Sequence, residues 1–237
     1  MSELFRILSI ALGIFLTALL QTAAACDNRL SVWDLPLGTS ASELLGTFQD
    51  HACGTNGGPP SRPLSGFEDY HLCETDEQGF YEVYFRYDDE QEFVARALEQ
   101  DRRIAMCQGT RVFDIPVIAS GLFDDSGILR GMRLVTDARG ALPANRNDHW
   151  ALGSMLRKKF SGNWRCHPLP LGSGDTPAAS FVPNQECTLG TDNTEFFVRQ
   201  TYFHRTGQSF RDEFGVVHPN LFVSETYFQI IQDAAAP

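Results

Sequence analysis

The sequence predicts an α+β fold of two tandem units, each a helix and a disulfide-clipped loop packed on an antiparallel sheet. Three observations predict it. Two cysteine pairs, Cys53/Cys73 and Cys166/Cys187, stand about half a chain apart in matching surroundings. Each pair encloses a loop rich in glycine and proline, which breaks regular structure. Each also lies between a stretch with helical spacing of apolar residues and a strand-like stretch.

The first 25 residues read as a signal peptide that is cleaved after Ala25. Met1–Arg6 is a short polar start with a cation, Ile7–Leu20 is an unbroken apolar or small-residue run, and Ala23–Ala25 fits the small-residue cleavage rule. The apolar run is shorter than the roughly 20 residues of a membrane span. Two alternatives stay open: an uncleaved membrane anchor, or a lipid-modified Cys26 after cleavage at the same bond.

Cleavage after Ala25 leaves an even number of cysteines, which an oxidising compartment allows to form three bonds. The duplicated spacing predicts the bonds Cys53–Cys73 and Cys166–Cys187. Cys26 and Cys107 remain. They pair with each other, or Cys26 carries lipid and Cys107 is free.

The first unit, residues 26–127, begins with a predicted helix from about Ala41 to Ala52. Ser40 and Glu43 form a capping box at its start. Phe80–Tyr87 alternates between two faces and is predicted to be a strand. A further helix is predicted from about Glu90 to Arg103, where apolar residues recur at helical spacing.

The second unit, residues 128–237, begins with the second strand of a predicted hairpin. The hairpin joins the strand-like runs Arg111–Phe123 and Ile128–Thr136 through a turn rich in Asp and Gly. A helix is predicted from Asn147 or Asp148 to Phe160, because its apolar spacing is helical and cations fill its last turns. Strands are predicted at Glu195–Phe203 and Leu221–Ile231. The two units form separate domains or one continuous domain.

The charge balance argues against nucleic acid as a partner. The formal net charge is −11 at pH 7, and so acidic a chain repels phosphate backbones and anionic lipid. Contact with a membrane is expected only if Cys26 is lipidated or the segment 7–20 is retained.

The sequence contains no catalytic, cofactor or metal motif, so no catalytic residue, cofactor or metal ligand is predicted. It has no Cys-x-x-Cys, which makes the cysteines structural. One alternative is a hydrolase at the first clipped loop. There, a Cys53–Cys73 bond would bring His51 and His71 together near Glu68 and Asp69.

The strands are rich in aromatic residues: the chain has 18 Phe, 6 Tyr and 3 Trp. Helices within the chain can cover these strands. Alternatively, an uncovered aromatic sheet face binds another protein, because exposed aromatic patches mark interaction sites. Tyr84, Phe196 and Tyr202 are the candidate residues of such a face.

This order of elements resembles the tandem helix-on-sheet organisation of the secreted β-lactamase inhibitor proteins. It resembles, more loosely, the small lipoproteins of the outer-membrane assembly machinery. The likeness covers only the element order and the paired cysteines, so no site residue is carried over. We expect a periplasmic or secreted protein without catalytic activity that binds an envelope protein or peptide. The alternatives are the hydrolase above and a membrane-anchored accessory subunit of an envelope complex.

Overall fold

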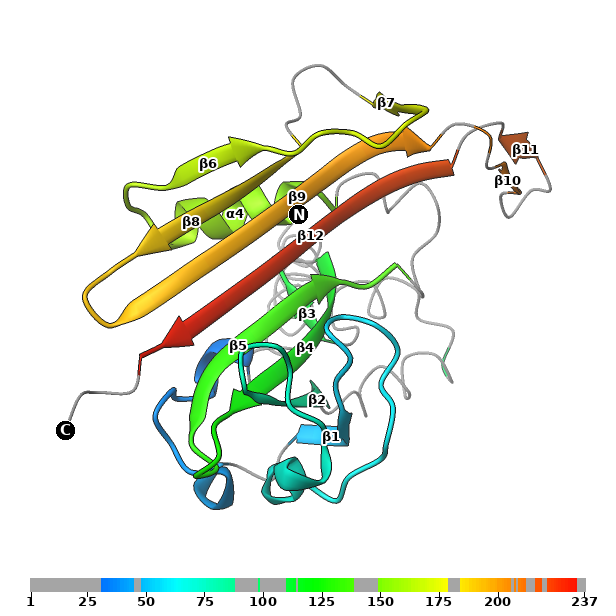
Figure 1. Cartoon of the computed structure of the whole chain (residues 1–237). Helices are drawn as coiled ribbons and strands as arrows, with labels where there is room; N and C mark the ends of the chain where they lie inside the picture. The colour runs from blue at the N-terminus through cyan, green and yellow to red at the C-terminus, as the bar shows by residue number, and fades with distance from the viewer. Residues whose placement is uncertain are drawn as a thin grey trace, which may run out of the picture.

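The computed structural model of the chain is dominated by an antiparallel sheet, with few helices (Figure 1). The structure is therefore consistent with the predicted α+β class, but the sheet contributes far more of it than the helices do. The structure describes residues 31–44, 48–87, 98, 110–113, 115–138, 149–178, 184–205, 207, 209–211, 216–218 and 221–233.

Eight strands follow one another across the main sheet. In spatial order they are β1 (Phe48–Cys53), β2 (Tyr81–Tyr87), β4 (Ile115–Phe123), β5 (Leu129–Thr136), β12 (Leu221–Gln232), β9 (Thr194–Arg205), β8 (Gln185–Gly190) and β6 (Arg165–Pro168). β3 (Arg111–Val112) pairs with β4, and β7 (Asp175–Pro177) pairs with β9. β10 (Phe210–Arg211) and β11 (Val217–His218) form a separate two-stranded sheet.

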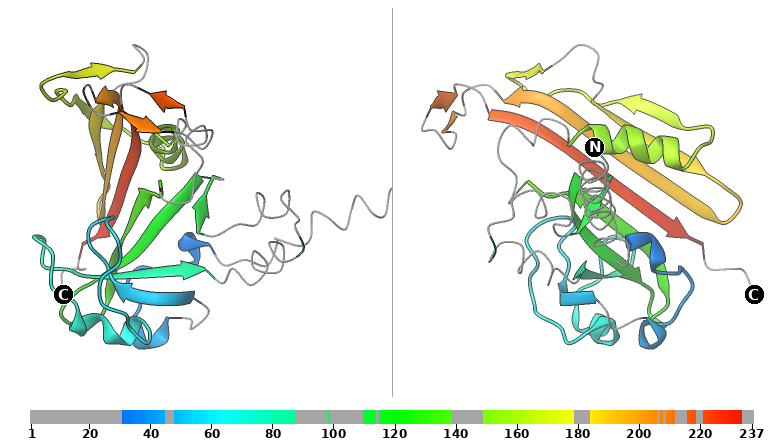
Figure 2. Two further views of the ribbon diagram at one scale, coloured as in Figure 1. Left: turned by 90° about the vertical axis from the view of Figure 1, so that its right-hand side faces the viewer. Right: turned by 180° about the vertical axis from the view of Figure 1, so that it is seen from behind.

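The strands of the N-terminal and C-terminal parts meet at one joint, the antiparallel pair of β5 and β12. Its register runs from Val135 opposite Tyr227 to Gly131 opposite Ile231. Figure 2 shows that the sheet is strongly bent, so that β9 and β12 stand at a steep angle to β1 and β2. The sheet is continuous across the joint, and its division into two tandem units stays a prediction.

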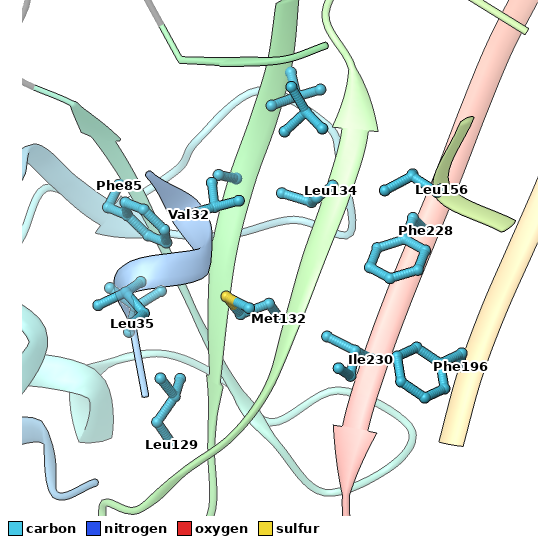
Figure 3. Packing of buried hydrophobic residues seen from close by; sticks show 14 of the residues in the cluster. Val32, Leu35, Phe85, Leu129, Met132, Leu134, Leu156, Phe196, Phe228 and Ile230 are labelled. Carbon is cyan, nitrogen blue, oxygen red and sulfur yellow. The ribbon is translucent and has the colours of Figure 1, made fainter. Parts of the chain in front are cut away.

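The hydrophobic core lies on one face of this sheet. Helix α4 (Ala151–Lys159) covers it over the C-terminal strands, with Leu152 and Leu156 fully buried. The 3-10 turns η2 (Val32–Asp34) and η4 (Phe67–Leu72) also pack on this face through Val32 and Phe67. Figure 3 shows the core running from Phe85 on β2 across the joint to Phe196 on β9.

The predicted hairpin is confirmed as β4 and β5. Asp124 closes its turn by accepting hydrogen bonds from the amides of Ser126 and Ile128 and from Arg130. Burial alone would raise the pKa of Asp124, but these hydrogen bonds outweigh it and hold the pKa below its usual value. The other three predicted strands are confirmed as β2, β9 and β12.

The helix predicted over Ala41–Ala52 is wrong. The structure has a 3-10 turn, η3 (Ala41–Glu43), followed by strand β1. Ser40 forms no side-chain cap, and the capping box of this region belongs to Ser31 and η2 instead. The sequence of the segment explains the difference, because its Gly and Thr residues are poor helix formers and its end gains a strand partner in β2.

The second predicted helix is confirmed in α4, which carries Arg157, Lys158 and Lys159 in its last turn. The helix predicted at Glu90–Arg103 lies outside the described residues, apart from Leu98. The segment 1–25, Cys26 and Cys107 also lie outside them. In the part of the chain that is described, no helix is long and apolar enough to cross a membrane.

Both predicted disulfides are confirmed. Cys53 and Cys73 join the end of β1 to the end of η4, with 5.3 Å between their Cα atoms. Cys166 and Cys187 face each other across β6 and β8, 4.0 Å apart at Cα. Two such bonds are typical of a protein that matures in an oxidising environment.

Removing either disulfide is expected to lower the free energy of unfolding by about 3 kcal/mol, because the two bonds close loops of nearly equal length. The test is urea unfolding of Cys53→Ala/Cys73→Ala and of Cys166→Ala/Cys187→Ala beside the unchanged protein. A loss below about 1 kcal/mol in either double variant would show that the bond does not constrain the unfolded chain.

Candidate functional site: a buried arginine cluster beside an open sheet face

The two faces of β9 and β12 differ sharply in environment. Alternate residues such as Phe196, Val198 and Phe228 point to the core under α4 and are buried. The intervening residues point to the opposite face, which we call the open face. Its members on these strands are Glu195, Phe197, Arg199 and Thr201 of β9 and Glu225, Tyr227, Gln229 and Ile231 of β12. Most are half-buried or exposed, and Figure 1 looks onto this face.

A cluster of buried polar groups lies at the joint on the same face. Arg133 of β5 is 3% exposed. Its Nη1 donates to Glu82 of β2 at 2.5 Å, and its Nη2 donates to Asp76 at 2.9 Å. Its Nε and Nη2 both donate to Oε1 of Gln229 on β12, at 3.1 and 2.8 Å. The guanidinium thus joins its own strand to two segments that are far away in the sequence, one with Asp76 and Glu82 and one with Gln229.

Sheet geometry explains how Arg133 and Glu82 meet. β4 lies between their strands, and adjacent strands are about 4.8 Å apart, so the two side chains must span about 10 Å. Ser120 of β4 is directly opposite Arg133 and Leu122 of β4 is directly opposite Glu82, so the ion pair crosses β4 diagonally. Burial alone would lower the pKa of Arg133, but the charges of Glu82, Tyr227 and Asp76 and the hydrogen bond to Asp76 together outweigh burial and raise the pKa.

Two loops of the N-terminal part complete the cluster. Asp76 closes its own turn by accepting from the amides of Gln78 and Phe80, which leaves its second oxygen for Arg133. The amide of Asn56 donates to Glu82 at 2.8 Å. The Gly/Pro-rich loop can lie this close to Glu82 because Gly54 has no β-carbon. A β-carbon at this position would lie only 2.3 Å from Cγ of Glu82.

An open pocket of about 610 Å³ lies where these loops face the open sheet face. We call it the Arg133 pocket. Its lining is formed by Asn56, Thr75, Asp76, Glu77, Gln78, Arg133, Glu195, Phe197, Arg199, Tyr227, Gln229 and Ile231. Its volume lies in the range of 300 to 1,000 Å³ that is usual for ligand sites, and its lining is more polar than that of most small-molecule pockets.

Tyr227 is the aromatic centre of this pocket. Phe197 meets its ring edge-on at 5.8 Å, and the guanidinium of Arg199 lies 5.0 Å from the ring centroid. The Tyr227 hydroxyl donates to Gln229 at 2.9 Å. Burial raises the pKa of Tyr227, although the adjacent Arg133 partly opposes this shift. The hydroxyl therefore stays protonated and acts as a donor at neutral pH.

The arrangement suits recognition of a ligand. Every nitrogen of the Arg133 guanidinium is already engaged, so Arg133 fixes its neighbours and shapes the pocket wall. The groups that face the pocket without an ion pair in the described chain are Glu77, Glu195 and Arg199. In the described segments, no group of three or more His, Cys, Asp or Glu residues could hold a metal ion.

The structure does not bring Tyr84, Phe196 and Tyr202 onto one face. Tyr84 is on the same side as the Arg133 cluster but is 8% exposed and packs with Ala52 and Ile118. Phe196 is a core residue under α4. Tyr202 shares the face of Phe196 and packs against Trp150. Strand alternation separates these residues, because β9 presents even-numbered positions to the core.

The histidines of the hydrolase alternative are in different environments. His51 is half-buried in β1 and meets Phe67 edge-on at 4.7 Å. His71 is exposed, and its Nδ1 lies 3.2 Å from the Glu68 carbonyl oxygen. The Asp69 carboxylate accepts from the amide of Ser65 and closes a turn. Each group makes a local structural contact, so this geometry gives the hydrolase alternative no support.

The Arg133 cluster was not predicted from the sequence. A signal was present, since Glu82 and Arg133 have opposite charges and lie within strand-like runs that are rich in apolar residues, although each run carries one further charge, Arg86 or Arg130. A charge within an apolar strand requires a partner when the strand is buried. The spacing along the chain did not identify that partner, because it lies two strands away.

No family model matches this chain, and neither a curated protein nor a solved structure matches it. The functional argument therefore rests on the geometry described above.

Replacing Arg133 with Met is expected to lower the free energy of unfolding by about 3 to 5 kcal/mol, because it leaves Glu82 buried without its counterion. The double variant Glu82→Gln/Arg133→Met should lose less than the two single losses added together. Chemical unfolding of the four proteins gives the coupling energy.

The matched control for this cycle is Arg86→Met. Arg86 forms an ion pair with Asp50 at 3.3 Å, and both side chains are substantially exposed. Such a pair contributes at most about 1 kcal/mol. If Arg133→Met and Arg86→Met lowered the free energy of unfolding equally, burial would not make the Arg133 ion pair more important for stability than an exposed pair.

His51 is expected to make the folded state less stable in mild acid. Burial lowers the pKa of His51 below its ordinary value of 6.5, and Asp50 only partly opposes this. Its contribution to stability is therefore complete above pH 6.5 and is lost as the pH falls through the folded-state pKa. Unfolding midpoints between pH 8 and 5 should fall less in His51→Leu than in the unchanged protein. His71→Leu, at an exposed histidine, serves as the control, and an equal change in both variants would refute the assignment.

Proposed function

We propose that this chain is an exported binding protein that holds another protein or a peptide on its open face, beside the Arg133 pocket. One observation carries the proposal: the open face of β9 and β12 combines charged side chains that are half-buried or exposed with the half-buried Phe197 and the buried Tyr227, whereas the opposite face is packed under α4. Interaction surfaces are enriched in Tyr, Phe and Arg around a partly desolvated centre.

The pocket supports the proposal because it is continuous with that face. Phe197, Arg199 and Tyr227 belong both to the open face and to the pocket lining. A chain segment lying along β9 and β12 can therefore insert a side chain between the loops and the sheet. This combination of a broad face and one recess is typical of peptide recognition, where pockets for individual side chains provide specificity.

The proposed location is the periplasm or the outside of the cell. The two disulfides support an oxidising compartment, and the N-terminal sequence supports export. A partner in the envelope follows from that location. Nucleic acid is a poor candidate, since the net charge of −11 repels it.

Affinity capture from an envelope extract tests this proposal with two charge insertions. Thr201→Arg places a long cation on the open face of β9. Met155→Arg places the same group on the exposed side of α4, where Met155 is 41% exposed. We expect Thr201→Arg to weaken retention of the captured partner at least about tenfold, or about 1.4 kcal/mol, and Met155→Arg to leave it unchanged.

Circular dichroism and unfolding midpoints of both variants establish that they are folded. Capture that survives Thr201→Arg but is lost in Met155→Arg would place the interface on the helical side. Turnover of an ester, peptide or glycoside substrate that a single substitution abolishes would replace binding with catalysis.

A further inference from the structure

We infer that the Arg133 pocket receives a lysine or arginine side chain of the bound protein or peptide. This inference rests on the proposed function, because it names the feature that the partner presents at the same site. It is carried by the charge of the pocket and by the shape and chemistry of its wall.

The charge balance at the pocket is negative. Arg133 and Arg199 supply two guanidinium groups, whereas Asp76, Glu77 and Glu195 in the lining and Glu82 behind it supply four carboxylates. In their ionised forms these groups leave a net charge of −2. A concave site with low-dielectric walls concentrates such a field, so it favours a cationic ligand.

Part of this charge has little contact with solvent, since the side chain of Glu82 is 6% exposed and that of Asp76 is 19% exposed. Arg133 is shared by two carboxylates, so the triad of Arg133, Glu82 and Asp76 carries a net charge of −1. The Oε1 atom of Glu82 is buried and has no hydrogen-bond partner within the described residues. An incompletely compensated buried charge is costly, and a cation in the adjoining pocket reduces that cost.

The walls match the rest of such a side chain. Phe197 and Ile231 provide an apolar surface for its methylene groups, while Glu77 and Glu195 at the exposed rim provide acceptors for its charged end. Lys and Arg commonly bury their aliphatic stems while their charged ends stay at a polar rim. Arg199 contacts the Tyr227 ring and forms no ion pair within the described residues, so Glu77 and Glu195 remain available to a ligand cation.

Titration with small probes tests the inference without the partner. The probes are the acetylated methylamides of lysine, arginine, norleucine and glutamate, and binding is followed by amide chemical shifts of the full mature protein. We expect the lysine and arginine probes to bind with millimolar Kd and to shift amides of the pocket. The norleucine and glutamate probes should not bind there.

Charge variants then locate the binding. Glu195→Gln should weaken the lysine probe about twofold to fivefold, and addition of Glu77→Gln should weaken it further, in line with the strength of exposed ion pairs. The control is Glu225→Gln, which removes the same charge from the open face outside the pocket lining and should leave the Kd unchanged. Equal binding of norleucine, or a Kd unaffected by both pocket variants, would overturn the inference.

The experiments distinguish failure of the proposed binding function from failure of the inferred cation site. Partner capture that depends on Thr201, together with no binding of the cationic probes, leaves the binding function and removes this inference. Probe binding in the pocket without any captured partner supports a cation site but removes the macromolecular partner on which the inference rests.

Discussion

The structure depends on one constraint: a guanidinium buried at the joint of β5 and β12 must be satisfied by groups from both sides of it. Glu82 and Asp76 come from the N-terminal strands and loops, and Gln229 comes from the last strand. A buried cation with any of these partners missing is strongly unfavourable. The need to satisfy Arg133 therefore fixes the loops near residues 56 and 76 against the sheet, and this position creates the pocket.

Features determined by local sequence were predictable. The β4–β5 hairpin follows from two apolar runs around an Asp/Gly turn, and Asp124 caps that turn. The Cys53–Cys73 and Cys166–Cys187 bonds follow from duplicated spacing. The helix expected before Cys53 failed because pairing of β1 with β2 is a tertiary interaction, and it overrides a weak helical pattern.

The candidate site was not predictable, because it forms only when distant strands become neighbours. Arg133 and Gln229 face each other across the joint although 96 residues separate them in the chain. Aromatic content was also a poor guide to the site. Phe196 and Phe228 pack in the core with Trp33 and Phe160, and only alternation along β9 places Phe197 on the opposite face. The proposed binding surface and the core therefore share the same strand and the same residue type.

Fold stability and occupation of the pocket are coupled in this arrangement. The triad that holds the joint together has one carboxylate more than its guanidinium can neutralise, and the pocket is where a counter-charge can approach it. A ligand that binds only the folded chain raises its stability by an amount that grows with ligand concentration. A cation held beside Arg133 and Asp76 would act on the same contacts that join β5 to β12. Under the proposed function, recognition and folding therefore rest on the same small set of charges.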